Sequence, residues 1–323
     1  MLGGSDVRRL LPMADCIEAM EEVLRSHARA RVVLPLRTVL PVAGHGSLYV
    51  MPAWTAEPES LAVKLITLFP GNTELGKETH QGIVVLFGAD GAVEALIEGG
   101  SLTAIRTAAV SAVATRALSN PDASGLAILG SGVQAGSHFE AMCAVRPIRR
   151  VRVWSRTRAN AAVFVKQLQE STGEVEIAVA ESAREAVRGA DIICTVTGSP
   201  TPVIESGWID AGAHINAVGA STAKTRELDS ETVARAHFYV DSREAALAEA
   251  GDLLIPLGEG RFGPDHIAAE LGAVLVGSGP GRSAKEDITV FESLGLAIED
   301  AAAARVLANR AAAETGLSRL AMD

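Results

Sequence analysis

A glycine-rich turn near the middle of the chain has the spacing of a phosphate-binding motif. The segment Gly130-Ser-Gly132-Val-Gln-Ala135 follows a short apolar run typical of a buried strand and precedes a helical pattern. Gly130 permits a tight turn, Gly132 lets the backbone approach a pyrophosphate, and Ala135 lets the helix pack close to a sheet. The N–H groups at the start of such a helix bind anions. The segment therefore predicts a dinucleotide site, and the alternative is a tight strand-to-helix turn without a ligand.

The residues after the next predicted strand indicate which dinucleotide would bind. NAD sites usually have Asp or Glu at this position, where it binds the ribose hydroxyls. This chain instead has Ser155-Arg156-Thr157, without a carboxylate. An acidic side chain would repel a 2′-phosphate, whereas Arg156 between two hydroxyl groups would bind it. NADP(H) is therefore favoured over NAD(H), and a solvated basic loop is the alternative.

The composition of the 323-residue chain excludes several classes of protein. Apolar residues make up 48% and charged residues 21%, close to ordinary globular usage, so a disordered chain is excluded. The length suggests two domains. The 39 acidic residues outnumber the 29 basic ones, and the net charge of −10 opposes binding to nucleic acid or to an anionic membrane surface. A small anionic molecule can still bind in a local basic pocket.

The cysteines and the apolar runs bear on the location of the protein. Cys16, Cys143 and Cys194 lie far apart and form no CxxC or zinc-type spacing, so we expect neither a disulfide framework nor a metal site. The first residues lack a signal-peptide pattern, and no stretch has the roughly 20 nearly continuous apolar residues of a membrane span. These features predict a soluble, cytoplasmic protein.

The middle of the chain alternates between strand-like and helical patterns. Apolar strand candidates lie at residues 126–129, 151–154, 175–179, 191–196, 214–218 and 238–240, and helical patterns at 135–145, 160–170 and 182–188. Buried strands that alternate with helices are typical of a parallel sheet with helices on both faces. We therefore expect a doubly wound α/β domain over residues 120–296.

The two ends of the chain have a different pattern. An amphipathic helix is predicted over residues 13–30 and a second helix over 101–118. Strand-like segments at 32–41, 46–51, 61–69 and 82–87 are joined by turn-like residues at 43–46, 70–72 and 89–91. The alanine-rich tail, residues 294–321, predicts a helix that packs back on the first part. We expect residues 1–119 and 297–323 to form an α+β domain.

Several segments together resemble the ornithine cyclodeaminase/mu-crystallin family over nearly the whole chain. They are Leu36–Val39, Val50–Ala53, Lys64-Leu65, Leu102–Ser111, Gly130–Ala135, His214–Ala220, Arg226–Asp229 and Val290–Gly295. Their order and spacing make the resemblance specific. It implies a Rossmann dinucleotide-binding domain over residues 120–296, joined to a substrate-binding and dimerisation domain that forms a homodimer.

The resemblance also implies roles for individual residues. Arg37, Lys64 and Arg106 match basic positions that bind the substrate carboxylate, and Leu294 matches an apolar residue that lines the substrate pocket. For each cation a surface ion pair is the alternative, but Lys64 and Arg106 have apolar sequence neighbours, and a buried cation needs an anionic partner. Further positions that contact the cofactor in the family correspond here to Thr107, Val133, Gln134, Ser155, Thr195, Asn216 and Ser293.

Thr79 and His80 resemble the family segment close to the nicotinamide. His80 is either a proton donor or a polar residue at a strand edge. In the cyclodeaminases of the family, an aspartate stands at the position that Ser221 occupies here, and a lysine stands at the position of Thr225. Because a serine hydroxyl is a poor acid or base without a partner, we do not expect cyclodeamination.

These residues favour an NAD(P)H-dependent oxidoreductase that reduces the C=N bond of small imino acids. Cyclic ketimines are the preferred substrates: Δ1-pyrroline-2-carboxylate or Δ1-piperideine-2-carboxylate, which would give proline or pipecolate. The proton for the imine nitrogen would come from Lys64, His80, Ser221 or water. The alternatives are an open-chain imino acid reductase or amino acid dehydrogenase of the alanine or iminosuccinate type, an ornithine cyclodeaminase, and a non-enzymatic NADPH- or ligand-binding protein of mu-crystallin type.

Overall fold

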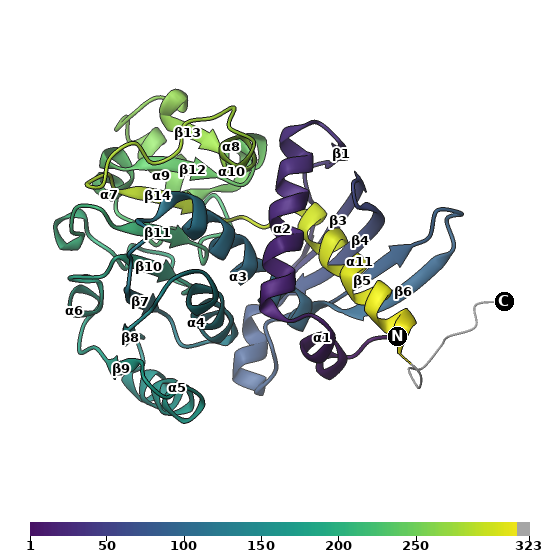
Figure 1. Cartoon of the computed structure of the whole chain (residues 1–323), viewed down its shortest axis with the longest axis horizontal. Helices are drawn as coiled ribbons and strands as arrows, with labels where there is room; N and C mark the ends of the chain where they lie inside the picture. The colour runs from purple at the N-terminus through teal and green to yellow at the C-terminus, as the bar shows by residue number, and fades with distance from the viewer. Residues whose placement is uncertain (315–323) are drawn as a thin grey trace. The chain divides into compact units, whose positions relative to one another are not determined.

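The structure, a computed structural model, describes residues 1–314, without the side chains of residues 73 and 74 (Figure 1). The chain divides into two compact units: Met1–Thr107 with Gly295–Asp323, and Ala108–Leu294. Helix α3, Gly99–Leu118, crosses the first of these boundaries. The boundaries expected from the sequence follow residues 119 and 296 instead. The roles expected for the two parts stay predictions. Among the helices of residues 1–314, none has an apolar stretch that could span a bilayer.

The first unit contains a six-stranded sheet with antiparallel pairing. Its strands are β1 (Val32–Val33), β2 (Thr38–Val42), β3 (Gly46–Ala56), β4 (Glu59–Leu68), β5 (His80–Phe87) and β6 (Val93–Glu98). The order is β1-β3-β4-β5-β6, with β2 also paired to β3. The expected single strand over residues 32–41 is two strands, because Pro35 between them has no N–H to donate to a ladder.

The connections of this sheet agree only in part with the sequence. The turn expected at 43–46 joins β2 to β3, as predicted, and the turn expected at 89–91 follows β5 and leads into β6. The prediction of a short turn at 70–72 is wrong, because these residues begin the 3-10 helix η1, Pro70–Leu75. This helix lengthens the connection between β4 and β5. Strand β6 was not predicted.

Two long helices cover one face of this sheet. Helix α11 (Ala297–Ala313) packs on β3, β4, β5 and α2 (Met13–Ala28), and the short α1 (Gly4–Leu10) contacts α11 and β6 (Figure 1). The run Ala301–Ala304 is fully buried, and its small side chains let the helix backbone approach the strands. The predicted return of the tail onto the first part is therefore confirmed. The part of that predicted helix beyond residue 314 lies outside the described residues.

The second unit is an eight-stranded parallel sheet in the order β13-β12-β14-β11-β10-β7-β8-β9. The strands are β7 (Gly125–Leu129), β8 (Arg150–Trp154), β9 (Glu176–Val179), β10 (Ile192–Thr195), β11 (His214–Ala217), β12 (His237–Val240), β13 (Ile267–Glu270) and β14 (Thr289–Glu292). The helices are α4 (Val133–Val145), α5 (Arg158–Ser171), α6 (Ala183–Val187), α7 (Ser230–Arg235), α8 (Arg243–Glu249), α9 (Gly251–Gly258) and α10 (Leu271–Leu275). The predicted doubly wound α/β fold is confirmed.

The strand order identifies the edge at which a ligand of this unit would bind. From β7 the chain continues to β8 and β9 on one side, whereas β10 and β11 lie on the other. Ligands of doubly wound sheets bind outside the carboxyl ends of the strands where the order reverses. Here that point lies between β7 and β10, and the glycine turn directly follows β7.

Candidate active site

The glycine turn has the geometry that a phosphate cradle requires. Gly130 has a φ of +125°, and a Cβ on it would lie 2.7 Å from the carbonyl oxygen of Val196, which follows β10. Only glycine meets both demands. Gly132 is the N-cap of α4, and a Cβ on it would meet no atom within 4 Å. The space in front of α4 is therefore open to a ligand.

The first amides of α4 are available to an anion. Within residues 1–314 the backbone N–H groups of Ser131, Gly132, Val133 and Gln134 have no hydrogen-bond acceptor. The side-chain oxygen Oε1 of Gln134 is buried and also has no partner there. A pyrophosphate would satisfy such N–H groups and would be stabilised by the helix dipole. These residues fit a dinucleotide.

The loop after β8 holds a cation that has no partner in its own unit. Arg156 is exposed and makes no ion pair among residues 1–314, whereas the neighbouring Arg158 lies 2.5 Å from Glu181. Thr157 is the N-cap of α5, but its hydroxyl accepts no hydrogen bond from the helix. The hydroxyl of Ser155 accepts a 3.1 Å hydrogen bond from Ser131. The loop therefore fits a phosphate group better than an internal ion pair.

In the first unit, two predicted cations meet two buried acidic residues. Lys64, on the face of β4 that carries α11, lies with its Nζ 2.6 Å from Oδ2 of Asp300. Arg106, on α3, donates from Nε to Oδ1 of Asp300 at 3.0 Å and from Nη1 to Oε2 of Glu299 at 2.7 Å. All four side chains are at most 5% exposed. Asp300 thus bridges Lys64 and Arg106.

The charges in this cluster shift each other's ionisation. Burial lowers the pKa of Lys64 to about 8, with Asp300 acting to raise it and Arg106 to lower it further. Burial opposes the charge of Arg106 as well, but Asp300 and Glu299 together raise its pKa. Arg106 is therefore a permanent cation, whereas Lys64 can change its charge near neutral pH.

The other predicted residues of the first unit have other neighbours. Arg37 precedes β2 and lies over the ring of Tyr49, 5.7 Å from its centroid. His80 begins β5, and its Nδ1 lies 3.1 Å from the Thr79 hydroxyl. Burial, and then the Lys64 cation, lower the pKa of His80. His80 is therefore neutral at pH 7 and within electrostatic range of Lys64. Thr107 is buried on α3, one residue after Arg106.

The remaining residues lie in the second unit, and most follow its strands. Thr195 ends β10, Ser293 and Leu294 follow β14, and Ser221 lies in the loop after β11. They share the carboxyl edge of the sheet with the glycine turn, and Ser293 Oγ is buried without a partner among residues 1–314. Asn216 differs from the others.

The side chain of Asn216 is committed to the interior of the second unit. Its Nδ2 donates to Thr115 Oγ1 at 2.9 Å, and its Oδ1 lies 3.3 Å from Nε2 of His214. The structure therefore does not bring the Asn216 amide to the carboxyl edge, and its predicted contact with the cofactor stays untested.

Sequence reasoning missed the acidic residues that organise both units. Glu299 and Asp300 occupy the first turn of α11, where acidic residues are common for the helix dipole alone. The available signal was the need of Lys64 and Arg106 for anionic partners. In the second unit, buried Glu227 accepts 2.7 Å hydrogen bonds from the backbone N–H groups of Thr197 and Gly219. It thereby joins the loops that follow β10 and β11.

The doubly wound sheet with its glycine turn places the second unit in the class of Rossmann-type folds. The model of the ornithine cyclodeaminase/mu-crystallin family matches residues 1–315. A ketimine reductase mu-crystallin of Mus musculus is 46% identical over 278 residues, which cover 85% of this chain and 84% of the relative. The chain therefore belongs to the ornithine cyclodeaminase/mu-crystallin family.

Two solved structures share the architecture. The Δ1-pyrroline-2-carboxylate reductase of Thermococcus litoralis, in complex with NADH and L-proline, has a TM-score of 0.94 and 39% identity, covering 97% of both chains. An archaeal alanine dehydrogenase dimer with bound NAD has a TM-score of 0.94 and 30% identity, covering 100% of this chain and 98% of that one. The resemblance expected from the sequence is confirmed.

Proposed function

We propose that this chain is an NAD(P)H-dependent reductase of small imino acids. Its preferred substrates are cyclic ketimines: Δ1-pyrroline-2-carboxylate or Δ1-piperideine-2-carboxylate, which give proline or pipecolate. The observation that carries the proposal is the buried pair of cations, Lys64 and Arg106, which contact the two oxygens of the same carboxylate, that of Asp300. Two similar proteins support it, because they are named as reductases of this kind: the ketimine reductase mu-crystallin of Mus musculus and the Δ1-pyrroline-2-carboxylate reductase of Thermococcus litoralis.

The cations bind the carboxylate of the substrate. Arg106 Nη2 has no acceptor among residues 1–314, and Lys64 Nζ has one carboxylate partner there. Both cations therefore keep N–H donors for a further anion. Charge-assisted hydrogen bonds from an ammonium and a guanidinium hold a carboxylate strongly and fix its orientation. This fixes the position of the adjoining imine carbon, and positioning supplies much of the rate enhancement in such reactions.

Reduction of an imine also requires a proton on the nitrogen. When bound, the nicotinamide cofactor supplies the hydride. Lys64, with a pKa of about 8, is mostly protonated at pH 7 and can give up its proton, so it suits a general acid. His80 is less suited, because the lowered pKa leaves it neutral at that pH. Lys64 is thus the preferred proton donor, with Ser221 and water as alternatives.

The second unit would bind the cofactor through the glycine turn and the loop after β8. Gly130, Gly132 and the first amides of α4 would hold the pyrophosphate. The exposed guanidinium of Arg156 and the hydroxyls of Ser155 and Thr157 would hold a 2′-phosphate. NADPH is therefore the preferred cofactor and NADH the weaker one.

A substrate panel tests this function. The purified protein is offered cyclic ketimine acids, open-chain imino acids and ornithine, each with NADPH and with NADH. We expect cyclic ketimines to oxidise NADPH fastest and ornithine to give no reaction. Conversion of ornithine to proline without net consumption of reduced cofactor would instead assign cyclodeamination. It would contradict the inference that Ser221 cannot replace the aspartate of the cyclodeaminases. Cofactor binding without turnover of any imino acid would indicate a binding protein.

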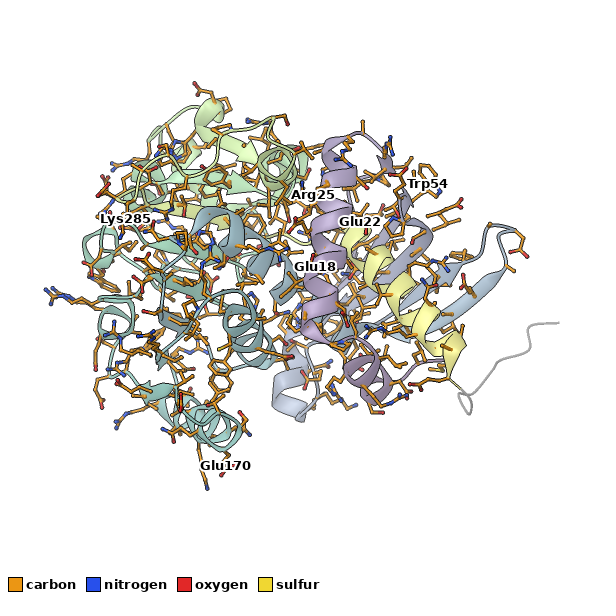
Figure 2. The ribbon with its side chains drawn as sticks, in the orientation of Figure 1. Glu18, Glu22, Arg25, Trp54, Glu170 and Lys285 are labelled. Atoms are coloured by element: carbon orange, nitrogen blue, oxygen red, sulfur yellow. The ribbon has the colours of Figure 1, made fainter. Side chains whose placement is uncertain are left out.

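The first unit also supports a homodimer. The face of its sheet opposite α11 exposes large apolar side chains: Val33, Leu40, Trp54, Leu61 and Ile83. Trp54 is labelled in Figure 2, and Leu61 lies opposite it on the next strand. Several large apolar side chains exposed on one face commonly mark an interface. The similar alanine dehydrogenase is named a dimer, and the same association is proposed for this chain.

A cytoplasmic location is part of the proposal. Cys16, Cys143 and Cys194 are all free thiols in the structure. Free, widely separated cysteines suit a reducing compartment.

A further inference from the structure

We propose that Asp300 is the positioning residue of the carboxylate-binding site, with one oxygen holding the Lys64 ammonium and the other holding the Arg106 guanidinium, so that both cations are presented to the same substrate carboxylate. This inference rests on the proposed function and assigns the residue that makes the site. Asp300 itself need not touch the substrate.

The geometry separates Asp300 from its neighbour Glu299. Asp300 Oδ2 lies 2.6 Å from Lys64 Nζ, and Asp300 Oδ1 accepts from Arg106 Nε at 3.0 Å. Glu299 Oε2 forms an ion pair with Arg106 Nη1 at 2.7 Å. Loss of the Asp300 charge therefore affects both cations, whereas loss of the Glu299 charge acts mainly on Arg106.

Asp300 also controls the charge of Lys64. The groups that act on the Lys64 ammonium are Asp300 and Glu299 from α11, and Arg106 from α3. The Lys64 cation in turn lowers the pKa of His80, which begins the neighbouring strand β5. Burial and Arg106 favour neutral Lys64, and Asp300 is the largest influence in the opposite direction. Without the Asp300 charge, the pKa of Lys64 must fall further, and the ammonium would be lost at a lower pH.

The alanine-rich helix gives Asp300 a fixed place. Asp300 is 1% exposed, and the residues that follow it, Ala301–Ala304, are fully buried. A helix packed this closely on a sheet cannot shift to bring another acid to Lys64. The packing of α11 therefore sets the position of the Asp300 carboxylate. This carboxylate in turn sets the positions of the Lys64 and Arg106 cations.

The test compares two conservative variants, Asp300→Asn and Glu299→Gln. Each removes one buried negative charge at nearly constant volume. We measure kcat/KM for a cyclic ketimine against pH with NADPH. Above the pKa of Lys64, kcat/KM should decline in the wild type. In D300N the decline should begin at least about one pH unit lower, with kcat/KM at pH 7 reduced about tenfold or more. In E299Q the midpoint should stay within about 0.3 unit of the wild type, even if kcat/KM falls.

A second measurement follows Lys64 directly and needs no activity. The chain has five lysines, so NMR of protein with 13Cε-labelled lysine gives few signals, and the Lys64→Arg variant identifies that of Lys64. The Lys64 signal should titrate at lower pH in D300N than in the wild type and in E299Q. An unchanged Lys64 titration in a folded D300N protein would overturn the inference.

The two proposals fail in different ways. If the wild type reduces no imino acid, the proposed function is wrong, and the NMR titration still decides whether Asp300 sets the charge of Lys64. If the wild type is active and D300N keeps both its pH profile and its KM, the function stands and Asp300 is not the positioning residue. Circular dichroism of both variants at pH 7 establishes that they are folded.

Discussion

Gly295 lies directly against the guanidinium of Arg106. A Cβ built on Gly295 would stand 2.6 Å from Nη1 and 2.9 Å from Nη2, and the residue has a φ of +82°. Both the backbone conformation and the close approach exclude a side chain here. Gly295 comes just before α11, the helix that carries Glu299 and Asp300. One glycine therefore lets the chain pass the cation and bring its acidic partners into place.

Replacing Gly295 by alanine should impair substrate binding more than cofactor binding. The left-handed conformation costs an L-residue about 1–2 kcal/mol, and the methyl group would displace the Arg106 guanidinium. We expect the KM for a cyclic ketimine to rise about tenfold or more, which corresponds to a loss of about 1.4 kcal/mol of binding free energy. The Kd for NADPH should change little.

The matched control for Gly295→Ala is Gly277→Ala. Gly277 has a φ of +75°, but a Cβ on it would meet no atom within 4 Å. This variant should lose stability from backbone strain and keep its KM. If both variants raised KM equally, strain alone would explain the effect, and the contact with Arg106 would have no special role.

Much of the fold could be predicted from the sequence, because its strands and helices have strong local patterns. The run at 126–129 is apolar, the run at 151–154 is apolar except for Arg152, and each is followed by a helical period, so β7, β8 and their helices were found. Strand β13, Ile267–Glu270, was missed because Ile-Ala-Ala-Glu has weak strand preference and lies at the sheet edge. Its place in the sheet depends on its pairing with β12, which no local pattern encodes.

The site was harder to predict than the fold. The glycine turn is one local segment, so its geometry follows from its sequence. The partners of Arg106 lie 193 and 194 residues away along the chain. Sequence could indicate that Lys64 and Arg106 need anions, but the choice of Glu299 and Asp300 depends on how α11 packs on β4.

Arg156 should decide the preference between the two nicotinamide cofactors. It is an exposed cation without an ion pair among residues 1–314, in a loop where carboxylates select NAD. In Arg156→Glu, we expect the ratio of kcat/KM for NADPH to that for NADH to fall about tenfold or more, because a carboxylate repels the 2′-phosphate.

Arg188→Glu is the control for Arg156→Glu. It makes the same change of charge at the C-cap of α6, next to the amino edge of the sheet and away from the glycine turn. It should leave the cofactor ratio unchanged. A NADPH preference that survives Arg156→Glu would remove Arg156 from the phosphate site.

Leu61→Glu should prevent the proposed dimer. Leu61 is 42% exposed, on the sheet face opposite α11, and a carboxylate buried there without a partner would be costly. By light scattering after size exclusion, we expect a dimer for the wild type and a monomer for L61E. Val163→Glu adds the same charge at an exposed apolar residue of α5 and should stay dimeric. A monomeric wild type, or a dimeric L61E, would contradict the interface.

The second unit holds buried carboxyl groups that raise each other's pKa. Asp252, in the first turn of α9, accepts hydrogen bonds from the N–H groups of Glu227 and Leu228 at its Oδ1. Its Oδ2 is buried without a partner among residues 1–314. Burial, and then the charge of Glu227, raise the pKa of Asp252 to about 8. The same effects, together with Asp252 and Asp241, raise the pKa of Glu292.

These carboxyl groups should make the protein less stable as the pH rises from about 4 to 8. The folded state keeps the Asp252 proton up to about pH 8, whereas the unfolded chain releases it near the ordinary aspartate pKa. The folded state therefore binds more protons over this range, and stability falls by up to about 1.4 kcal/mol per pH unit for one group. Burial lowers the pKa of His138 to about 4, and this group acts in the opposite direction below about pH 6.5.

Asp252→Asn should reduce this dependence on pH, because it keeps an acceptor oxygen at the Oδ1 position and removes the titrating proton. Urea unfolding of the wild type and D252N at pH 5, 6, 7 and 8 gives the difference in unfolding free energy, in which the contribution of His138 cancels. The unfolding free energy of D252N relative to that of the wild type should increase with pH up to about 8. Glu205→Gln, at an exposed carboxylate, should track the wild type. A constant difference between D252N and the wild type across this range would show that Asp252 is ionised throughout.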